Sequence, residues 1–344
     1  MTGINSSDKI SIGIVGLGLM GSSIVVSLLS SGHPVVAIAA IDGEAKAGRQ
    51  RIIDQLFELG RFGSSEQTAE ESLSLLTISE DYAALRDCAM VIECVVEHLG
   101  IKEEVFKKIV ANVSNDTILA TNTSAIPISI LQQTIPQPQR FIGIHWAEPA
   151  FATRFMEIVC GRDTSQSTAR SVFKLAQQWG KEPTILKKDI RGFITNRLMY
   201  AVYREILSLV DKDIISFDDA DKAFRYDAGS WMMLMGIFRR MDYTGLADHA
   251  NAYNTIFPLL SNTESLPSTM KQLLDNGAKG VQNGKGFYNY SKAEAEQWKQ
   301  AFALFNVDIF HLASQYPAEN NTSDNNHDGN NGKVAACTDP RKIE

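Results

Sequence analysis

The amino-acid sequence predicts an α/β, doubly wound N-terminal domain followed by an all-α C-terminal domain. Apolar strand-like runs alternate with helical stretches through the first half, a glycine-rich turn follows the first run, and a purely helical periodicity takes over near residue 190. With 344 residues, the chain is long enough for two separate cores. We therefore expect an N-terminal domain over residues 1–189, a helical domain over 190–316 and a tail over 317–344.

Six apolar runs are expected to form the first strands, at residues 10–15, 35–40, 73–78, 90–95, 118–121 and 141–145. Helical stretches lie between them, such as 20–30 and 101–113. Near-continuous apolar strands separated by helices are typical of a parallel sheet that helices cover on both faces. Two further apolar runs, 155–159 and 183–186, flank an amphipathic helix near residues 167–179.

The second half is expected to consist of helices. Apolar residues at helical spacing from Ile194 to Ile206 predict one long amphipathic helix, and Ser216 and Asp242 are candidate N-caps of later helices. The segment 284–288 is expected to be a structural turn that ends this domain. The tail is rich in Asn, Asp and Gly and has too few apolar side chains to offset its ordering entropy, so we expect it to be disordered.

Charge and cysteine content narrow the class of protein. The net charge of −7 argues against nucleic acid as the main partner, because phosphate binding needs a basic stripe. No uncharged apolar run is long enough to span a membrane, and the polar residues 1–9 do not resemble a secretory signal. None of the four cysteines forms a close pair with metal-ligand or redox spacing, so we expect reduced thiols, no metal site and a cytoplasmic location.

A dinucleotide-binding fingerprint follows the first expected strand. In the sequence of residues 16–21, Gly16 permits a tight turn, Gly18 lets the backbone approach a pyrophosphate, and Gly21 lets helix and strand pack closely. The N-terminus of the following helix offers free N–H groups to the phosphates. A glycine-rich turn without a ligand is the alternative. The flanking strand and helix favour a Rossmann-type cofactor site that includes Gly16, Gly18, Leu19, Met20 and Gly21.

The second expected strand lacks the acidic residue that usually binds the adenosine ribose hydroxyls. It ends in Ala39 and Ala40, and Asp42 follows slightly late. Asp42 either reaches the ribose or only begins the next helix as a cap. No arginine follows immediately to bind a 2′-phosphate, although Lys46 and Arg49 are near. NAD is therefore the expected cofactor, and NADP stays open.

A histidine and a glutamate form the candidate catalytic pair. His145 ends an expected strand, and ligands of open α/β sheets bind outside such strand ends. Glu157 lies inside the apolar run 155–159, where a carboxylate is costly to bury unless it is paired. We expect His145 to take the hydroxyl proton during hydride transfer while Glu157 fixes its tautomer and stabilises the imidazolium. A structural or surface histidine is the alternative.

The chain resembles the L-3-hydroxyacyl-CoA dehydrogenase family over about residues 10–290. The resemblance rests, in this order, on Gly16–Gly21, Glu93-Cys-Val-Val-Glu97, Asn122-Thr-Ser124, Phe141-Ile-Gly-Ile-His145, Glu157, Gly192-Phe-Ile-Thr-Asn-Arg197 and Gly284-Lys-Gly-Phe-Tyr288. It implies that His145 and Glu157 are the catalytic dyad, that Ser124 contacts substrate and cofactor, and that Asn196 orients the substrate carbonyl. It also implies cofactor contacts for Glu97, Lys102 and Asn122.

Four of these residues have plainer alternatives. Ser124 can serve as the N-cap of an expected helix at 126–131. Asn196 can make a simple buried hydrogen bond within the long helix. Glu97 and Lys102 can form a solvated pair at a helix start.

Two departures from the family pattern bear on substrate and cofactor. Family members usually have His-Phe-Phe-Asn-Pro, where this chain has His145-Trp-Ala-Glu-Pro149, so Glu148 replaces an asparagine beside the nicotinamide and substrate. This second carboxylate either stabilises a charged imidazole or selects a substrate with positive charge. The family's lysine-rich segment that contacts CoA corresponds here to residues 55–61, which carry little positive charge, and this weakens the CoA assignment specifically.

The leading functional prediction is NAD-dependent interconversion of a 3-hydroxyacyl-CoA, such as 3-hydroxybutyryl-CoA, and its 3-oxoacyl-CoA. The alternative is the same chemistry on a free 3-hydroxy acid, such as a sugar acid or a carnitine-like compound. A non-catalytic NAD(H)-binding protein is a third possibility, against which His145, Glu157, Ser124 and Asn196 argue together. The resemblance and the apolar segments 231–235 and 256–260 also predict a homodimer formed by the helical domain.

Overall fold

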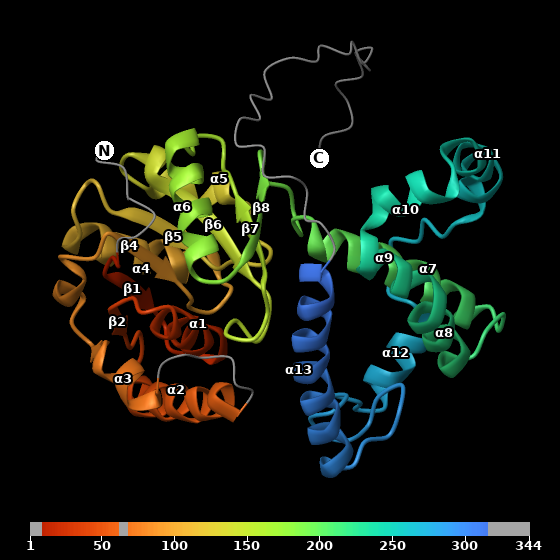
Figure 1. Cartoon of the computed structure of the whole chain (residues 1–344), viewed down its shortest axis with the longest axis horizontal. Helices are drawn as coiled ribbons and strands as arrows, with labels where there is room; N and C mark the ends of the chain where they lie inside the picture. Colours follow the sequence, from red (N-terminus) through yellow and green to blue (C-terminus); the bar gives the residue numbers. More distant parts are fainter. Residues whose placement is uncertain (1–8, 62–67, 316–344) are drawn as a thin grey trace, which may run out of the picture.

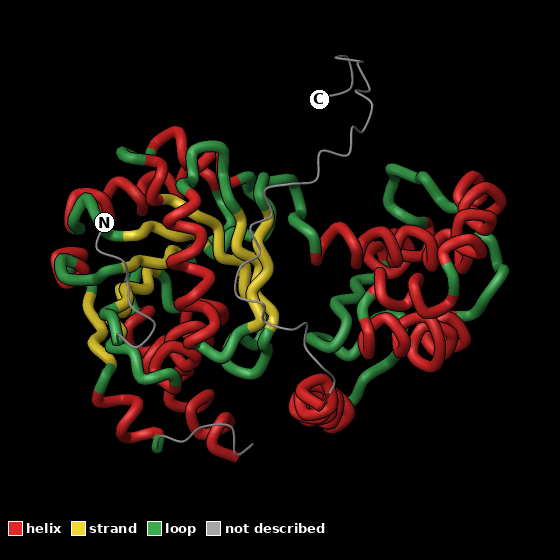
Figure 2. The backbone as a smooth tube through the Cα atoms, turned by 45° about the horizontal axis from the view of Figure 1, so that its top comes forward, coloured by secondary structure: helices red, strands yellow, loops and turns green. Residues whose placement is uncertain are grey.

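The computed structural model describes residues 9–61 and 68–315, and the expected tail from residue 317 lies outside them. The described chain forms two parts (Figure 1). The first is a sheet flanked by helices, and the second is an assembly of helices. Figure 2 shows the same arrangement from a second direction, with the helical part beyond the edge of the sheet. The expected fold class is confirmed.

One eight-stranded sheet forms the first part, in the strand order β3-β2-β1-β4-β5-β6-β7-β8. Neighbouring strands run parallel except for β6 and β7, which are antiparallel. The sequence pattern did not predict this reversal. The strands are β1 (Ile12–Val15), β2 (Val35–Ile38), β3 (Leu76–Ser79), β4 (Met90–Glu93), β5 (Ile118–Thr121), β6 (Phe141–Trp146), β7 (Phe155–Val159) and β8 (Glu182–Leu186).

Helices cover both faces of the sheet. One buried apolar cluster joins strand residues to α1, α2 and α6, and a second joins the opposite strand faces to α4 and α5. This arrangement explains the near-continuous apolar strands. The helices of this part are α1 (Leu19–Ser30), α2 (Glu44–Arg61), α3 (Ala69–Ser74), α4 (Leu99–Asn112), α5 (Ile128–Leu131) and α6 (Gln166–Gln178), with 3₁₀ turns η1 (Tyr82–Leu85), η2 (Gln132–Thr134) and η3 (Pro138–Arg140).

The expected third strand began too early. Residues 73 and 74 belong to α3, and the strand itself runs over Leu76–Ser79. A capping box starts α3, in which the Thr68 hydroxyl accepts a hydrogen bond from the Glu71 amide and Glu71 bonds back to the Thr68 amide. The apolar run 73–78 therefore begins in a helix and ends in a strand. Periodicity alone does not locate the boundary between the two elements.

The second part is helical, as expected. Ser216 caps α8, because its hydroxyl accepts a hydrogen bond from the Asp219 amide. Asp242 is not a cap, because it lies inside α10 and Gly236 precedes that helix with φ +79°. The elements are α7 (Thr195–Asp211), α8 (Phe217–Ala223), the π-turn η4 (Phe224–Ala228), α9 (Gly229–Met235), α10 (Ile237–Thr244), α11 (Leu246–Ile256), η5 (Phe257–Leu259), α12 (Ser268–Asp275) and α13 (Lys292–Gln315). Since α13 follows it, the turn at 284–288 does not end this part.

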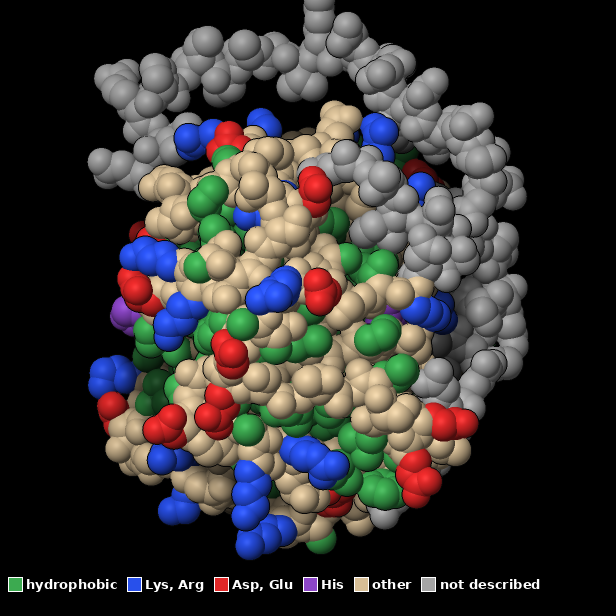
Figure 3. Space-filling view, turned by 90° about the vertical axis from the view of Figure 1, so that its left-hand side faces the viewer, with side chains coloured by type: hydrophobic (Ala, Val, Ile, Leu, Met, Phe, Trp, Pro, Cys, Tyr) green, Lys and Arg blue, Asp and Glu red, His purple; other side chains and the backbone are tan. Residues whose placement is uncertain are grey.

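On the face of the first part that Figure 3 shows, Lys and Arg side chains lie interspersed with Asp and Glu side chains. The described residues of this face therefore present mixed charge rather than one continuous basic stripe. No helix within residues 9–61 and 68–315 is long and apolar enough to cross a membrane.

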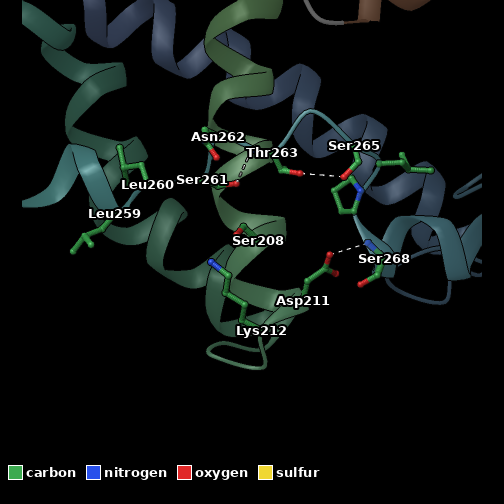
Figure 4. Close-up of a pocket in the computed structure, with 12 residues that line it drawn as sticks. Ser208, Asp211, Lys212, Leu259, Leu260, Ser261, Asn262, Thr263, Ser265 and Ser268 are labelled. Carbon is green, nitrogen blue, oxygen red and sulfur yellow. Dashed lines mark hydrogen bonds between the residues drawn. The ribbon is translucent and has the colours of Figure 1, made fainter.

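The end of α7 fixes the start of α12 (Figure 4). The Asp211 carboxylate accepts hydrogen bonds from the Ser268 amide at 2.8 Å and from the Thr269 amide at 2.9 Å. It also accepts a bond from the Thr269 hydroxyl, and these bonds, the hydroxyl's first, lower the pKa of Asp211 to about 2. A carboxylate at a helix N-terminus satisfies free amides and opposes the positive end of the helix dipole.

Candidate active site

The glycine loop leaves an open space at the N-terminus of α1. Gly16 has φ +96°, a conformation that favours glycine. A Cβ on Gly21 would lie 1.9 Å from the Gly16 carbonyl oxygen, so only glycine fits there. A Cβ on Gly18 would meet nothing within 4 Å, and no side chain caps α1. This unfilled space beside free helix amides fits the pyrophosphate of a dinucleotide.

The other predicted loop residues begin α1. Leu19 is its first residue and is 57% exposed, while Met20 packs partly against the core. Asp42 is exposed beyond the end of β2. The position between the loop and this strand end is taken instead by Glu44, whose carboxylate accepts hydrogen bonds from the Leu17 amide at 2.8 Å and the Ala40 amide at 2.7 Å. Sequence reasoning missed Glu44, although an acid in the first turn of the second helix was visible.

The antiparallel pair β6 and β7 places His145 opposite Glu157. His145 Nδ1 donates a hydrogen bond to Glu157 Oε2 at 2.6 Å. The Glu157 side chain is fully buried, whereas the His145 side chain is 15% exposed. Phe193 packs against the imidazole with ring centroids 5.6 Å apart. Because Nδ1 is engaged, Nε2 is the ring nitrogen that remains to exchange a proton with a ligand.

The second oxygen of Glu157 binds the start of α7. Glu157 Oε1 accepts hydrogen bonds from the Ile194 amide at 2.8 Å and from the Thr195 amide at 3.0 Å. Burial alone would raise the pKa of Glu157, but the bonds from His145, Thr195 and Ile194 outweigh it and lower that pKa. Glu157 therefore stays ionised beside the imidazole at neutral pH, and it binds the first turn of α7 next to the His145–Glu157 pair.

Asn196 follows directly on this first turn and contacts the Ser124 segment. Its Nδ2 donates to the Ser124 carbonyl oxygen at 3.3 Å, which leaves the exposed Ser124 hydroxyl for a ligand. Ser124 is not the N-cap of the following helix, because α5 begins at Ile128 after Pro127. Thr123 instead accepts a bond from the Ile126 amide at 3.0 Å. Glu157 therefore binds His145 through one oxygen and the start of α7 through the other, and Asn196 in that first turn binds Ser124.

An ionic cluster of Lys102, Glu93 and Glu97 lies next to the turn that carries Ser124. Lys102 is 1% exposed and donates to both oxygens of Glu93, at 2.8 and 3.0 Å, while its distance to Glu97 Oε2 is 3.3 Å. The alternative of a solvated Glu97–Lys102 pair is therefore wrong for Lys102. The cofactor contact that the resemblance implied for Lys102 is wrong as well, because its ammonium is buried and bound to Glu93 and Glu97. Glu97 Oε1 accepts a bond from the Ser124 amide at 3.2 Å. Burial opposes the ionisation of Glu97, but bonds from the Thr123 hydroxyl and Lys102 hold its pKa below the usual value.

Asn122 supports the end of β6, and Lys181 supports the segment that follows it. Asn122 Oδ1 accepts a hydrogen bond from the Trp146 amide at 3.2 Å, so Asn122 supports the strand end that carries His145. Glu148 is exposed on the loop that follows. Lys181, which the sequence reasoning did not single out, is buried below this loop and donates to the carbonyl oxygens of Ala150 and Thr153, both at 2.6 Å.

A cleft of about 860 Å³ begins at Ser124 and Asn196 and continues along α7. Three guanidinium groups and two tyrosines line it, together with apolar residues of the segment before α12. In the part of the chain that the structure describes, none of these arginines forms an ion pair. The residues are Arg191, Arg197, Tyr200, Tyr203 and Arg204.

Residues 11–190 match the family described as 3-hydroxyacyl-CoA dehydrogenase, NAD binding domain, and residues 192–290 match its C-terminal domain. The chain belongs to the 3-hydroxyacyl-CoA dehydrogenase family. It is an NAD-dependent oxidoreductase, and the resemblance stated from its motifs is confirmed. The Rossmann-type fingerprint, the dyad positions and the helical second part all lie within the matched residues.

Relatives within this family differ in substrate. The 5-formyl-3-hydroxy-2-methylpyridine 4-carboxylate 5-dehydrogenase of Mesorhizobium japonicum is 28% identical over 286 residues, which are 83% of this chain and 92% of that protein. The mitochondrial hydroxyacyl-coenzyme A dehydrogenase of Homo sapiens is 29% identical over 290 residues, 80% of this chain and 90% of that protein. A crystal structure of a 5-formyl-3-hydroxy-2-methylpyridine 4-carboxylic acid 5-dehydrogenase, described as an NAD⁺-dependent dismutase, has a TM-score of 0.82 at 26% identity. The match covers 90% of this chain and 100% of that chain.

Proposed function

We propose that this oxidoreductase interconverts a 3-hydroxy compound and its 3-oxo counterpart, with His145 as the proton acceptor and Glu157 as its partner. The observation that carries this proposal is the 2.6 Å contact between His145 Nδ1 and a fully buried, ionised carboxylate. It orients the imidazole at the carboxyl end of a sheet, where open α/β folds bind ligands. A complete pair of this kind argues against a protein that binds NAD(H) without turnover.

Bound NAD supplies the hydride acceptor at this site. His145 Nε2 takes the hydroxyl proton as the C–O bond gains double-bond character, and Glu157 stabilises the resulting imidazolium. The Ser124 hydroxyl and the Asn196 amide bind the substrate oxygen, so that the reacting carbon faces the nicotinamide. Glu97, Asn122 and Glu148 border the cofactor, whereas the buried Lys102 acts through Glu93 and Glu97. Glu97 holds the Ser124 turn in place.

The dyad is tested by His145→Gln and Glu157→Gln. General-base catalysis contributes about 10²–10⁴-fold, so His145→Gln should lower kcat by roughly that factor. Glu157→Gln should also lower kcat. NADH affinity, measured by nucleotide fluorescence, should survive both changes, because neither residue lies at the glycine loop. Nearly full turnover by His145→Gln on a verified substrate would contradict the proton-transfer role.

Family membership supports a 3-hydroxyacyl-CoA, such as 3-hydroxybutyryl-CoA, as one substrate class. A free hydroxy acid is the second, and two observations favour it. The unpaired arginines along α7 suit a carboxylate in the cleft that begins at Ser124 and Asn196, because guanidinium binds carboxylate in a planar, bidentate way. The relative in Mesorhizobium japonicum acts on a free pyridine carboxylate.

Initial rates with NADH or NADPH against acetoacetyl-CoA and a panel of free 3-oxo acids separate the two classes. If the acid is free, Arg204→Gln should raise its KM by about tenfold with a smaller change in kcat, since it removes a charge-assisted contact away from the reacting carbon. Lys212→Gln, directly after the end of the same helix and outside the cleft, is the matched control. A preference for acetoacetyl-CoA that Arg204→Gln leaves unchanged would assign the CoA class. The expected cytoplasmic location stays a prediction.

A further inference from the structure

The adenosine end of the cofactor site lacks its usual acid but contains a carboxylate from another element. β2 ends at Ile38 and continues into Ala39 and Ala40, neither of which can bind a ribose hydroxyl through a side chain. The Glu44 carboxylate, from the first turn of α2, lies between this strand end and the glycine loop. A strand-end acid occupies that same position in dinucleotide-binding folds.

The carboxylate is held and still able to accept more bonds. Its Oε1 accepts one bond from the Leu17 amide and its Oε2 accepts one from the Ala40 amide. An ionised carboxylate has about four acceptor sites, so each oxygen keeps one for a hydroxyl donor. Glu44 is only half-buried, which leaves it accessible to a ligand at the loop. Two fixed amides orient it before the ligand arrives.

One of the neighbouring cations, Arg51, is not placed for a phosphate. Arg51, on the same helix, donates from Nη2 to the Leu17 carbonyl oxygen and from Nε to the Ser22 hydroxyl, at 3.4 Å for the latter. Its guanidinium is therefore engaged with the loop. A 2′-phosphate on the ribose would meet the Glu44 charge instead, and like charges repel.

We infer that Glu44 accepts hydrogen bonds from the adenosine ribose hydroxyls of NAD and sets the preference for NAD over NADP. Asp42, exposed and farther along the connection, does not have this role. The inference rests on the cofactor and not on the proposed substrate, so it can fail or hold independently of the dyad.

The test measures nucleotide affinity without any substrate. In Glu44→Gln we expect the Kd of NADH to rise by about tenfold, the effect of losing a hydrogen bond to a charged group, while the Kd of NADPH falls. Asp54→Asn removes an exposed charge from the same helix and should change neither value. Equal weakening of both nucleotides in Glu44→Gln would mean that Glu44 only holds the loop, and would overturn the inference.

A second measurement addresses the hydroxyl itself. ADP should displace NADH from the wild type about tenfold better than 2′-deoxy-ADP does, whereas Glu44→Ala, checked for folding by its Tm, should not distinguish them. Retained discrimination in Glu44→Ala contradicts the inference. So does an Asp42→Asn variant that shows the affinity changes expected of Glu44→Gln.

Discussion

At the scale of single residues, the site divides into positions that the sequence marks and positions that only the fold reveals. His145 and Glu157 were predicted because a strand-end histidine and a carboxylate within an apolar run are unusual. Glu44 was not, because sequence shows that an acid begins α2 but not that its side chain reaches back to the glycine loop. Lys181 was missed for the same reason, since its two carbonyl acceptors lie about 30 residues earlier in the chain.

The glycine loop supports a residue-scale prediction. Gly18→Val should abolish NADH binding and leave the Tm almost unchanged, because Gly18 has an ordinary φ of −63° and its Cβ would point into open space. Gly21→Val should lower the Tm sharply, because its Cβ would overlap the Gly16 carbonyl oxygen. The measurements are NADH fluorescence titration and thermal unfolding. Normal NADH binding by a folded Gly18→Val protein would count against the loop as the pyrophosphate site.

At the scale of elements, most of the sheet was predictable. The expected strands at 118–121 and 155–159 have the observed bounds, because interior strands buried on both faces read as uninterrupted apolar runs. The direction of β7 was not predictable, since an apolar run carries no information about parallel or antiparallel pairing. That direction matters, because the antiparallel register sets His145 directly opposite Glu157.

The loop between β6 and β7 gives a prediction on pH. Burial, with a smaller contribution from Arg154, lowers the pKa of Lys181 to about 7. A neutral amine still has two N–H donors for the two carbonyl oxygens. The unfolded state, with a lysine pKa of about 10.4, then binds more protons than the folded state between pH 7 and 10. The free energy of unfolding should therefore rise with pH in that window, by up to about 1.4 kcal/mol per pH unit.

Lys181→Met should remove this rise, whereas Lys174→Met, an exposed lysine on α6, should retain it. Urea unfolding at pH 7, 8 and 9 measures the slope for the three proteins. Identical slopes in wild type and Lys181→Met would show that Lys181 keeps its proton when folded.

At the scale of the whole molecule, the helical part lacks a core of its own. Between residues 195 and 290, all of which are described, only Ala220 and Gly229 are buried. Large apolar side chains stay exposed instead, among them Phe238 and Leu259, both 80% exposed. Helices need to bury their apolar faces against another layer, and exposed patches of this size mark association surfaces. Composition could show the apolar content of 231–235 and 256–260, but not that this part leaves so much of it uncovered.

We therefore predict that two chains associate through their helical parts. Light scattering at micromolar concentration should give twice the chain mass of 37.9 kDa. Leu259→Asp should shift the mass toward the monomer, because it places a charge in the surface to be buried. Phe57→Asp, at a 60% exposed position on α2, should leave the dimer intact. A wild-type monomer at these concentrations would overturn the prediction.

The two oxygens of Glu157 face different partners, the imidazole on one side and the first amides of α7 on the other. Displacing α7 from the sheet removes two donors from that carboxylate and makes its negative charge less stable. The position of α7 and the protonation of Glu157 are therefore linked, and the linkage is reciprocal. We therefore expect a ligand that holds α7 against the sheet through Asn196 to favour the ionised form of Glu157.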